Sequence, residues 1–428
     1  MAAEGAADPA DPLCAAHLHC PPLAVAAAAD LAASALNPSM DSWDQAPAAS
    51  ELESQTCRAL ARLLYGEPTG DRVPDALVTT GGTESNQLGV LLAREQYGSH
   101  VRVVCGANAH HSAHRAAWLL GLPEPVTVPT PGGLLAPDML REALASHSKE
   151  TPGAPVLVIA TAGTTDLGAI DPLAELADVV REYGQLDGRS PGRARLHVDA
   201  AYGGMLLFSR RLRSRLAGLE RADSVTLDLH KLGWQPVAAG VFVVPDGHAL
   251  EPLDHRAEYL NADDDTDAGL PDLLGRSLRT TRRPDIFKMA VTLRALGRAG
   301  MASLVERVCD AALELAELVA EDPQFELFGM PELSTVLFRP VGADRAAVAE
   351  IRRRLLFEGR AVLGRAGREE LWLKATLLNP RTRRSDLESL LKLVHDALPA
   401  SPAPAVPTTS STSPASATPD SAARSLRS

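Results

Sequence analysis

A lysine that follows a short apolar run is the residue of this sequence best suited to covalent chemistry. Residues 224–231 read Ser-Val-Thr-Leu-Asp-Leu-His-Lys, a strand pattern that ends in His230 and Lys231. A lysine at the rim of a buried strand is poorly solvated, which favours its neutral, nucleophilic form. Such an amine can condense with an aldehyde. Strand-end lysines are more often surface cations, so this motif by itself leaves both interpretations open.

A turn rich in glycine and threonine provides a candidate anion site. Residues 79–86 read Thr-Thr-Gly-Gly-Thr-Glu-Ser-Asn and lie between a strand pattern and a helix pattern. Small residues let backbone N–H groups approach an anion, and the helix terminus adds positive potential. The turn lacks the Gly-Lys-Ser/Thr end of a nucleotide P-loop and the GxGxxG spacing of a dinucleotide fold. It therefore predicts a seat for a single phosphate, although many strand-to-helix turns look similar.

An aspartate and a histidine complete the candidate chemistry. Asp199 ends the apolar run Leu196-His-Val-Asp, where an ionised carboxylate requires a cationic partner. A protonated pyridine nitrogen is one such partner, and capping of the next turn is the alternative role. His110 follows the strand pattern of residues 101–105, and its flat imidazole can stack on a ring and exchange protons near neutral pH.

Two groups of histidine and cysteine raise metal binding as an alternative. One contains His110, His111 and His114, without a carboxylate or cysteine at ligand spacing. In the other, the spacing fits no standard zinc finger, and its members are Cys14, His17, His19 and Cys20. We expect no metal at either group.

Composition indicates an enzyme that acts on small molecules. The chain has 428 residues, is 45% hydrophobic and carries a formal net charge of -12. A phosphate surface would repel such a protein, so we expect neither nucleic acid nor an anionic membrane as a partner. Five cysteines at irregular spacing argue against a disulfide framework and favour a reducing, cytoplasmic location. Asp30 interrupts the Ala24–Ala35 run, and acidic residues stand where a signal peptide needs positive charge.

The central part of the chain alternates between strand and helix patterns, which predicts an α/β fold with a mostly parallel sheet. The predicted strands are Ala76–Thr79, Val101–Cys105, Val156–Thr161, Arg195–Asp199, Ser224–Leu229 and Ala238–Val244. A first helix is predicted through the alanine run and ends near Asn37-Pro38. Further helices are predicted at Glu51–Tyr65, Ser85–Tyr97, Ser112–Leu120, Pro172–Tyr183 and Ser209–Leu219.

The pattern changes beyond Thr281 and predicts a smaller α+β domain. A long helix over Asp285–Glu321 precedes strands at Leu333–Arg339 and Leu371–Leu377 and helices at Asp344–Glu358 and from Ser385 to Pro399. We therefore divide the chain into an N-terminal arm (1–50), a large domain (51–284), a small domain (285–398) and a tail (399–428). The tail is almost entirely Pro, Ala, Ser and Thr and is expected to be disordered.

Taken together, these motifs resemble those of the group II amino-acid decarboxylases that depend on pyridoxal 5'-phosphate (PLP), most closely the diaminobutyrate and siderophore-pathway lysine decarboxylases. The matching phrases run in family order from about Ala16 to Leu398. They are HLHCP (17–21), DSWDQ (41–45), TTGGTESN (79–86), ATAGTTDLGAIDPL (160–173), HVDAAYGG (197–204), ADSVTLDLHK (222–231), TTRR (280–283), LSTVLFR (333–339) and LLNP (377–380).

The resemblance implies a role for each residue around the cofactor ring. Lys231 would hold PLP as a Schiff base, and His230 would lie against the cofactor. Asp199 would pair with the pyridine nitrogen and keep the ring an electron sink. Ala201 would pack under the ring, and His110 would stack on its opposite face.

The resemblance also implies the remaining contacts of the site. Thr165 would hydrogen-bond the cofactor near its phenolic oxygen or Asp199. Lys374, which precedes LLNP, would receive the substrate carboxylate, and Trp43 would contact the substrate. The phosphate would be bound by Gly82, Thr83 and Ser85.

The resemblance implies the PLP-dependent transferase-like (fold type I) architecture, a homodimer with its active site at the subunit interface, and decarboxylation of an amino acid. Aspartates at 263, 264, 265 and 267 could attract a basic substrate such as 2,4-diaminobutyrate, lysine or ornithine, although such a run is often only a solvated surface. Aromatic substrates, oxidative deamination, or PLP binding without turnover remain alternatives. The last of these rests on an N-terminal arm that is short for the family.

Overall fold

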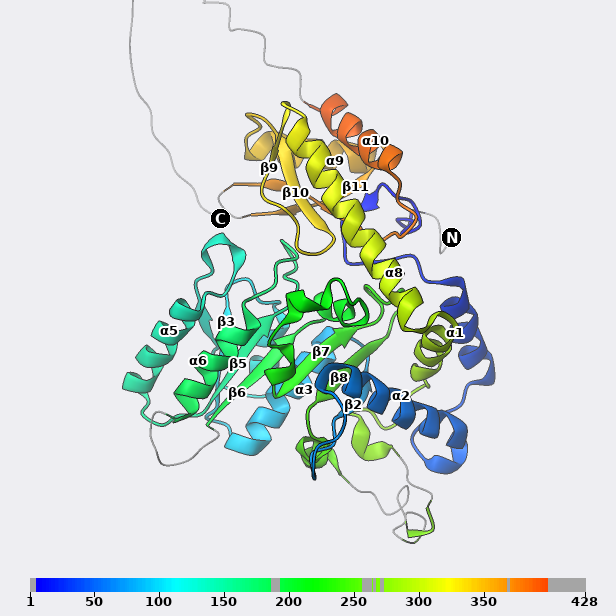
Figure 1. Cartoon of the computed structure of the whole chain (residues 1–428), viewed down its shortest axis with the longest axis vertical. Helices are drawn as coiled ribbons and strands as arrows, with labels where there is room; N and C mark the ends of the chain where they lie inside the picture. The colour runs from blue at the N-terminus through cyan, green and yellow to red at the C-terminus, as the bar shows by residue number, and fades with distance from the viewer. Residues whose placement is uncertain are drawn as a thin grey trace, which may run out of the picture.

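Two β-sheets of different size organise the chain, and one long helix runs from the first to the second (Figure 1). The computed structural model describes residues 5–185, 193–255, 264, 267–269, 273–367 and 370–398. The predicted tail at 399–428 and two aspartates of the acidic loop, Asp263 and Asp265, lie outside the described residues. Asp264 and Asp267 are exposed.

The larger sheet has seven strands in the order β2-β8-β7-β6-β5-β3-β4. All neighbours pair in parallel except β8, which is antiparallel to both β2 and β7. The predicted α/β class with a mostly parallel sheet is therefore confirmed. The strands are β2 (Asp75–Thr79), β3 (Arg102–Gly106), β4 (Val126–Val128), β5 (Val156–Thr161), β6 (Ala194–Asp199), β7 (Ser224–Asp228) and β8 (Gly240–Val244).

Helices cover both faces of this sheet, as its buried, apolar strands require. Alternate residues of one strand point to opposite faces: Val103 packs with α3 (Gly82–Tyr97) and α4 (Ser112–Leu119), whereas Val104 belongs to the core on the other face. The helices of that second face are α2 (Pro47–Tyr65), α5 (Pro137–Glu150), α6 (Leu173–Gln185) and the first part of α8 (Ile286–Glu321).

The smaller sheet has five strands in the order β1-β11-β12-β10-β9 and packs against α8, α9 (Arg345–Phe357) and α10 (Arg384–Asp396). The N-terminal segment, which we predicted to be a loop, contributes β1 (Cys14–Ala15), paired in parallel with β11 (Val362–Ala366). The segment around Cys14 therefore lies beside a strand from the C-terminal part of the chain (Figure 1). The other strands are β9 (Phe325–Leu327), β10 (Thr335–Pro340) and β12 (Trp372–Thr376).

Helix α8 connects the two sheets and confirms the predicted long helix. Its backbone breaks at Gly297, which has a left-handed φ of 61° that glycine adopts without a steric penalty. The residues before the break pack against α1 (Ala24–Leu36), and those after it support the smaller sheet (Figure 1). No helix in the described part of the chain combines the length and the apolar character needed to cross a membrane.

The helix predicted at Ser209–Leu219 is wrong. This segment forms short 3-10 turns, η4 (Arg213–Leu216) and η5 (Leu219–Arg221). The Ser209 hydroxyl accepts hydrogen bonds from the backbone N–H groups of Arg211 and Leu212, at 3.1 and 3.0 Å, which is the pattern of a helix N-cap, but no α-helix follows it. Gly218 then adopts a left-handed φ of 94°, which ends any helical run.

Candidate active site

The candidate site is a cavity of about 360 Å³ at the carboxyl ends of the parallel strands. Each strand delivers its site residue from the loop that follows it, so distant parts of the sequence meet at one edge of the sheet. Most of the residues that we predicted for the cofactor line this cavity: Gly82, Thr83, His110, Thr165, Asp199, Ala201, His230 and Lys231.

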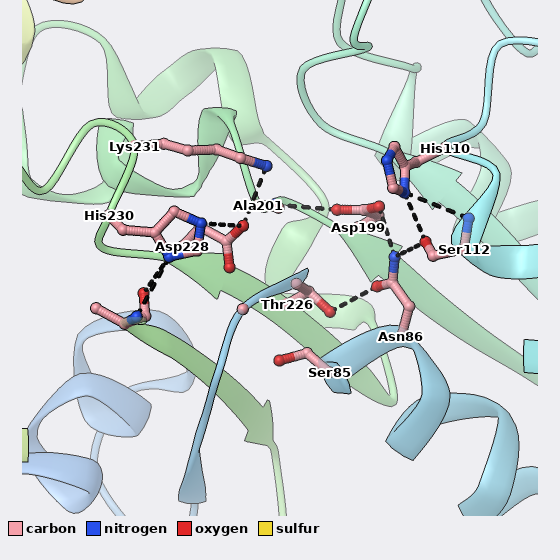
Figure 2. A network of polar contacts seen from close by, with 12 residues as sticks. Ser85, Asn86, His110, Ser112, Asp199, Ala201, Thr226, Asp228, His230 and Lys231 are labelled. Carbon is pink, nitrogen blue, oxygen red and sulfur yellow. Dashed lines mark hydrogen bonds and ion pairs between the residues drawn. The ribbon is translucent and has the colours of Figure 1, made fainter. Parts of the chain in front are cut away.

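Lys231 lies in the turn that follows β7, with its side chain 20% exposed. Its Nζ is 3.0 Å from Oδ2 of Asp228, a carboxylate that sequence reasoning did not assign to the site. Nε2 of His230 is 3.4 Å from the same oxygen. Burial lowers the pKa of His230 and outweighs the opposing effect of Asp228. The amine is therefore held inside the cavity by a carboxylate on its own strand (Figure 2).

Trp234 fixes the turn that carries Lys231. The indole is fully buried, and its Nε1–H donates a 2.8 Å hydrogen bond to the carbonyl of Leu378, which lies beyond β12. The backbone carbonyl of Trp234 accepts a 3.0 Å hydrogen bond from the N–H of Leu23. Both ends of the chain thus contact the segment that presents the lysine.

The start of α3 forms a cradle beside Lys231. Gly81 has a φ of 150°, and a Cβ there would lie 2.7 Å from the His230 ring. A Cβ at Gly82 would meet Ala201 at 3.1 Å and the carboxylate of Asp228 at 3.2 Å. Since the first N–H groups of a helix have no partner within it, this end is suited to an anion.

A buried carboxylate oxygen beside this cradle lacks a partner. Asp228 is 2% exposed, and its Oδ1 has no hydrogen-bond partner among the described residues. An orphaned oxygen in this position costs free energy until a donor reaches it. The cradle and the amine fit a group that carries a phosphate and an aldehyde, whereas this oxygen needs a hydrogen-bond donor that neither of those groups supplies.

Asp199 lies at the other end of the cavity, at the carboxyl end of β6. Its Oδ2 accepts a 2.7 Å hydrogen bond from Nδ2 of Asn86, and its Oδ1 accepts a 3.1 Å bond from the N–H of Ala201. These bonds hold the carboxylate while it lines the cavity (Figure 2). A buried carboxylate in this arrangement suits a cationic ring nitrogen.

His110 lies beside Asp199 and is linked to it through Ser112 and Asn86 (Figure 2). Its Nδ1 is 2.8 Å from the Ser112 hydroxyl and accepts a 3.3 Å bond from the Ser112 N–H. Burial lowers the pKa of His110 and outweighs the opposing effect of Asp199. The imidazole is therefore neutral at physiological pH.

The other predicted residues lie outside the cavity lining. The Ser85 hydroxyl is buried 2.7 Å from that of Thr79, and Trp43 is half-buried in the short turn η1 (Trp43–Gln45). Lys374 lies behind the wall, where its Nζ donates a 3.0 Å hydrogen bond to the carbonyl of Thr165. Burial lowers the pKa of Lys374, with Asp166 opposing from 3.8 Å.

Sequence reasoning did not assign Asn86, which holds Asp199, or Asp228, which pairs with Lys231. The described residues contain no group of three or more histidine, cysteine or acidic side chains placed to hold a metal. Asn86 ends the quoted phrase TTGGTESN, so its position one turn into a helix was a usable signal. Asp228 stands three residues before Lys231, a spacing that brings the two together in a turn.

Comparison with known proteins assigns the chain to a family. Residues 8–341 match the pyridoxal-dependent decarboxylase conserved domain. The L-2,4-diaminobutyrate decarboxylase of Rhizobium meliloti (strain 1021) is 39% identical, over 90% of this chain and 77% of its own length. The enzyme of the same name from Acinetobacter baumannii is 33% identical, over 89% and 78%.

A solved structure gives the same assignment. The glutamate decarboxylase domain of diaminobutyrate-pyruvate transaminase and L-2,4-diaminobutyrate decarboxylase from Vibrio parahaemolyticus superposes with a TM-score of 0.77 at 33% identity, covering 90% of this chain and 80% of the other. The predicted PLP-dependent architecture is thereby confirmed. With its cavity, its cradle and its strand-end lysine, the chain belongs to the pyridoxal-dependent decarboxylase family, and it is an amino-acid decarboxylase whose cofactor is PLP.

Proposed function

We propose that the substrate is L-2,4-diaminobutyrate, which loses CO2 to give 1,3-diaminopropane. The observation that carries this proposal is the identity of 39% and 33% to two L-2,4-diaminobutyrate decarboxylases over about nine-tenths of the chain. Lysine and ornithine have the same charges on longer side chains and are the next candidates.

The charge of the neighbouring cleft supports a basic substrate. This cleft of about 970 Å³ adjoins the cavity and shares His110 and Thr165 with it. Apart from histidines, Asp166 and Glu370 are the titratable side chains among the described residues that line it. Lys374 and Arg339 offset them only in part, at 3.8 and 3.2 Å. A second ammonium group is attracted by such a wall, whereas a second carboxylate is repelled.

The residues around the cavity divide the work between binding and proton handling. Lys231 would hold PLP covalently, and Asp199 would pair with its ring nitrogen. When bound, PLP supplies the electron sink that decarboxylation requires. Ala201 and His110 would pack against the ring, and neutral His110 can move a proton at its Nε2. Gly82, Thr83 and Ser85 would hold the phosphate, with His230 beside them.

The substrate is oriented by groups at the cleft side of the cavity. Thr165 contacts the cofactor, and Lys374 stands directly behind it with a buried positive charge. Its ion pair with Asp166 is long, at 3.8 Å, and we assign this charge to the α-carboxylate of the substrate, which would compete with Asp166 for it. Trp43 lies on the segment before α2, and we assign it to the side chain of the substrate.

A substrate panel tests the proposal. Purified enzyme loaded with PLP is incubated with 2,4-diaminobutyrate, ornithine, lysine, glutamate and tryptophan, and both CO2 and amine are measured. We expect 1,3-diaminopropane to form fastest, and Lys231→Ala to form none. A faster reaction with glutamate or tryptophan would refute the basic substrate, and hydrogen peroxide or an aldehyde would indicate oxidative chemistry instead.

We further propose a homodimer, with an apolar groove beside α1 as part of the contact. Leu36 is 77% exposed at its edge, and Leu31 on the same helix is 70% exposed. Exposed apolar surface of this kind marks an interface. The groove of about 300 Å³ is lined by Ala33, Leu36, Pro38, Ala46, Pro47, Ala48, Ala49, Leu52, Pro284 and Phe287. Sedimentation should show a dimer that Leu36→Glu weakens, and a monomeric active enzyme would refute the proposal.

A cytoplasmic location fits the cysteines. All five, Cys14, Cys20, Cys57, Cys105 and Cys309, are free thiols. Free buried thiols are typical of a reducing compartment. Cell fractionation tests this location.

A further inference from the structure

We infer that Asn86 and His197 are positioning residues that fix the directions of Asp199 and His110 together. Both lie outside the cavity lining, behind the residues that contact the cofactor. The inference concerns the cofactor side of the site, so it holds whichever amino acid is the substrate.

Asn86 uses every donor and acceptor of its side chain. Its Nδ2 donates to Oδ2 of Asp199 at 2.7 Å and to Oγ of Ser112 at 2.8 Å. Its Oδ1 accepts from Oγ1 of Thr226 at 2.8 Å and lies 2.9 Å from Nε2 of His197. The residue is 1% exposed. Rotating the amide by half a turn would place its oxygen against the Asp199 carboxylate, so the network admits one orientation.

The same bonds decide where the proton of His110 lies. Ser112 Oγ accepts one N–H of Asn86, and the backbone N–H of Ser112 donates to Nδ1 of His110. The Ser112 hydroxyl can then donate its own hydrogen to Nδ1 across 2.8 Å. Because the backbone N–H of Ser112 can only donate, the lone pair of Nδ1 faces these donors, and the neutral ring carries its hydrogen on Nε2. Asn86 therefore acts on His110 through Ser112 and on Asp199 directly (Figure 2).

His197 holds the carbonyl side of Asn86. Since that oxygen can only accept, Nε2 of His197 carries the hydrogen, and Nδ1 accepts from the Ser224 hydroxyl at 2.8 Å. Burial lowers the pKa of His197 to about 4, so the ring stays neutral. A neutral ring in this tautomer adds no positive charge that would draw the Asp199 carboxylate away from the cavity.

The fold gives the His197 ring a fixed slot. Helix α3 has a glycine, Gly89, where it passes the His197 ring. A Cβ at Gly89 would lie only 2.9 Å from Nδ1 of His197, so a larger residue would collide with the ring. On the other side Phe242 stacks at 6.0 Å between ring centroids and 26° between planes. A glycine in a helix interior is ordinarily unfavourable, and here it permits the contact between α3 and β6.

If these hydrogen bonds only stabilised the core, removing them would lower thermal stability. It would not change the spectrum of the bound cofactor or the tautomer of His110. The tests therefore measure the absorption spectrum and the Kd of bound PLP, and they determine kcat and KM separately. NMR of the cofactor-free protein determines which ring nitrogen of His110 carries the hydrogen.

The matched variants are Asn86→Leu, His197→Leu and His197→Gln. Leu removes the polar contacts at similar volume, whereas Gln at 197 retains a donor toward Oδ1 of Asn86. We expect the two Leu variants to bind PLP with a shifted absorption spectrum and a kcat about tenfold to a hundredfold lower, with KM changed less. His197→Gln should recover most of the loss. Gln87→Leu, on the neighbouring half-buried position of α3, is the control and should match wild type.

Two results would overturn the inference. One is a folded Asn86→Leu enzyme with the spectrum, Kd and kcat of wild type. The other needs no variant: NMR of the wild-type protein that finds neutral His110 protonated on Nδ1. If Asn86→Leu does not fold, Thr226→Val removes one donor to Oδ1 with little change in shape, and this spectral comparison together with the tautomer measurement decides the question.

Discussion

The two ends of the cavity are built in opposite ways. At the Asp199 end, Asn86 donates to one carboxylate oxygen and the N–H of Ala201 donates to the other. The Asn86 side chain is buried and fully hydrogen-bonded. At the Lys231 end, the lysine is 20% exposed, and the carboxylate it pairs with, Asp228, leaves Oδ1 without a partner among the described residues. One end is complete without a ligand, and the other is not.

This difference indicates which part of the site the chain organises by itself. A fully paired buried network gives a single arrangement. A buried oxygen without a donor raises the free energy of the folded state until something satisfies it. We therefore expect PLP binding to change the Lys231 end, where the amine becomes covalently attached, and to leave the Asp199 end almost unchanged.

The largest effect is expected from Lys231→Ala. Without the amine, covalent attachment is lost, together with the visible absorption band that it produces. Activity should fall by about a thousandfold or more, because substrate binding alone cannot replace a covalent catalyst. Absorbance and amine release measure the two losses. Activity within tenfold of wild type would mean that the incomplete end is not the attachment point.

Acid should destabilise the complete end. The folded pKa of His197 is about 4, below its usual 6.5, so the unfolded chain binds more protons between these values. The free energy of unfolding should therefore be highest above pH 6.5 and fall by about 3 kcal/mol as the pH drops to 4. Urea titrations across this range measure the fall.

His197→Gln is the comparison that isolates this contribution. The ring is faced by Asp199, which opposes the shift, and by Arg195, which adds to it. Burial also lowers the pKa of His110 and His230, so part of the acid slope will remain. Equal slopes in wild type and variant would show that His197 does not titrate in this range.

A smaller effect is expected from Asp228→Asn. The amide keeps the shape of Asp228 and removes a negative charge beside the phosphate cradle. Weaker repulsion should tighten PLP binding by about tenfold. Titration of the cofactor-free protein with PLP measures the change, and inorganic phosphate serves as a probe that cannot react with Lys231. Weaker binding of both ligands would show that the carboxylate itself is needed.

The smallest effect is expected from Ser85→Ala. The variant loses the 2.7 Å contact with Thr79, which should reduce the free energy of unfolding by about 1 kcal/mol. Because the Ser85 hydroxyl also stands near the cradle, the PLP affinity measured in parallel separates a packing role from a phosphate contact. A loss of affinity larger than the loss of stability would assign Ser85 to the phosphate.

Much of the large domain could be predicted because each strand carries its own apolar pattern. Val156–Thr161 is predicted with the observed bounds, and Ser224–Leu229 exceeds its strand by one residue. The short edge strand β4 was missed, because three residues give too little periodicity. Helix α5 was also missed, and the helix predicted at Ser209–Leu219 is replaced by short 3-10 turns interrupted by Gly218 with its left-handed φ.

For the site, the sequence predicted the residue types on the loops, but not what lies behind them. Most predicted cofactor residues line one cavity because strand order brings their loops together. The partners of Asn86 lie on other elements, so its position early in a helix could be predicted but its contacts could not, whereas the spacing of Asp228 and Lys231 was a local signal that was not used. Lys374 shows the same limit, since its register in β12 places it against the Thr165 carbonyl rather than in the cavity lining.

The contacts of Trp234 bear on the order of assembly. The turn that presents Lys231 is held by Leu23 on one side and by Leu378 on the other. A chain emerging from the ribosome therefore cannot finish this turn until its last strand has been made. Contacts between residues that are so far apart in the sequence form late in folding. We expect nascent chains that stop before residue 378 to emerge without a bound cofactor, however complete the large sheet already is.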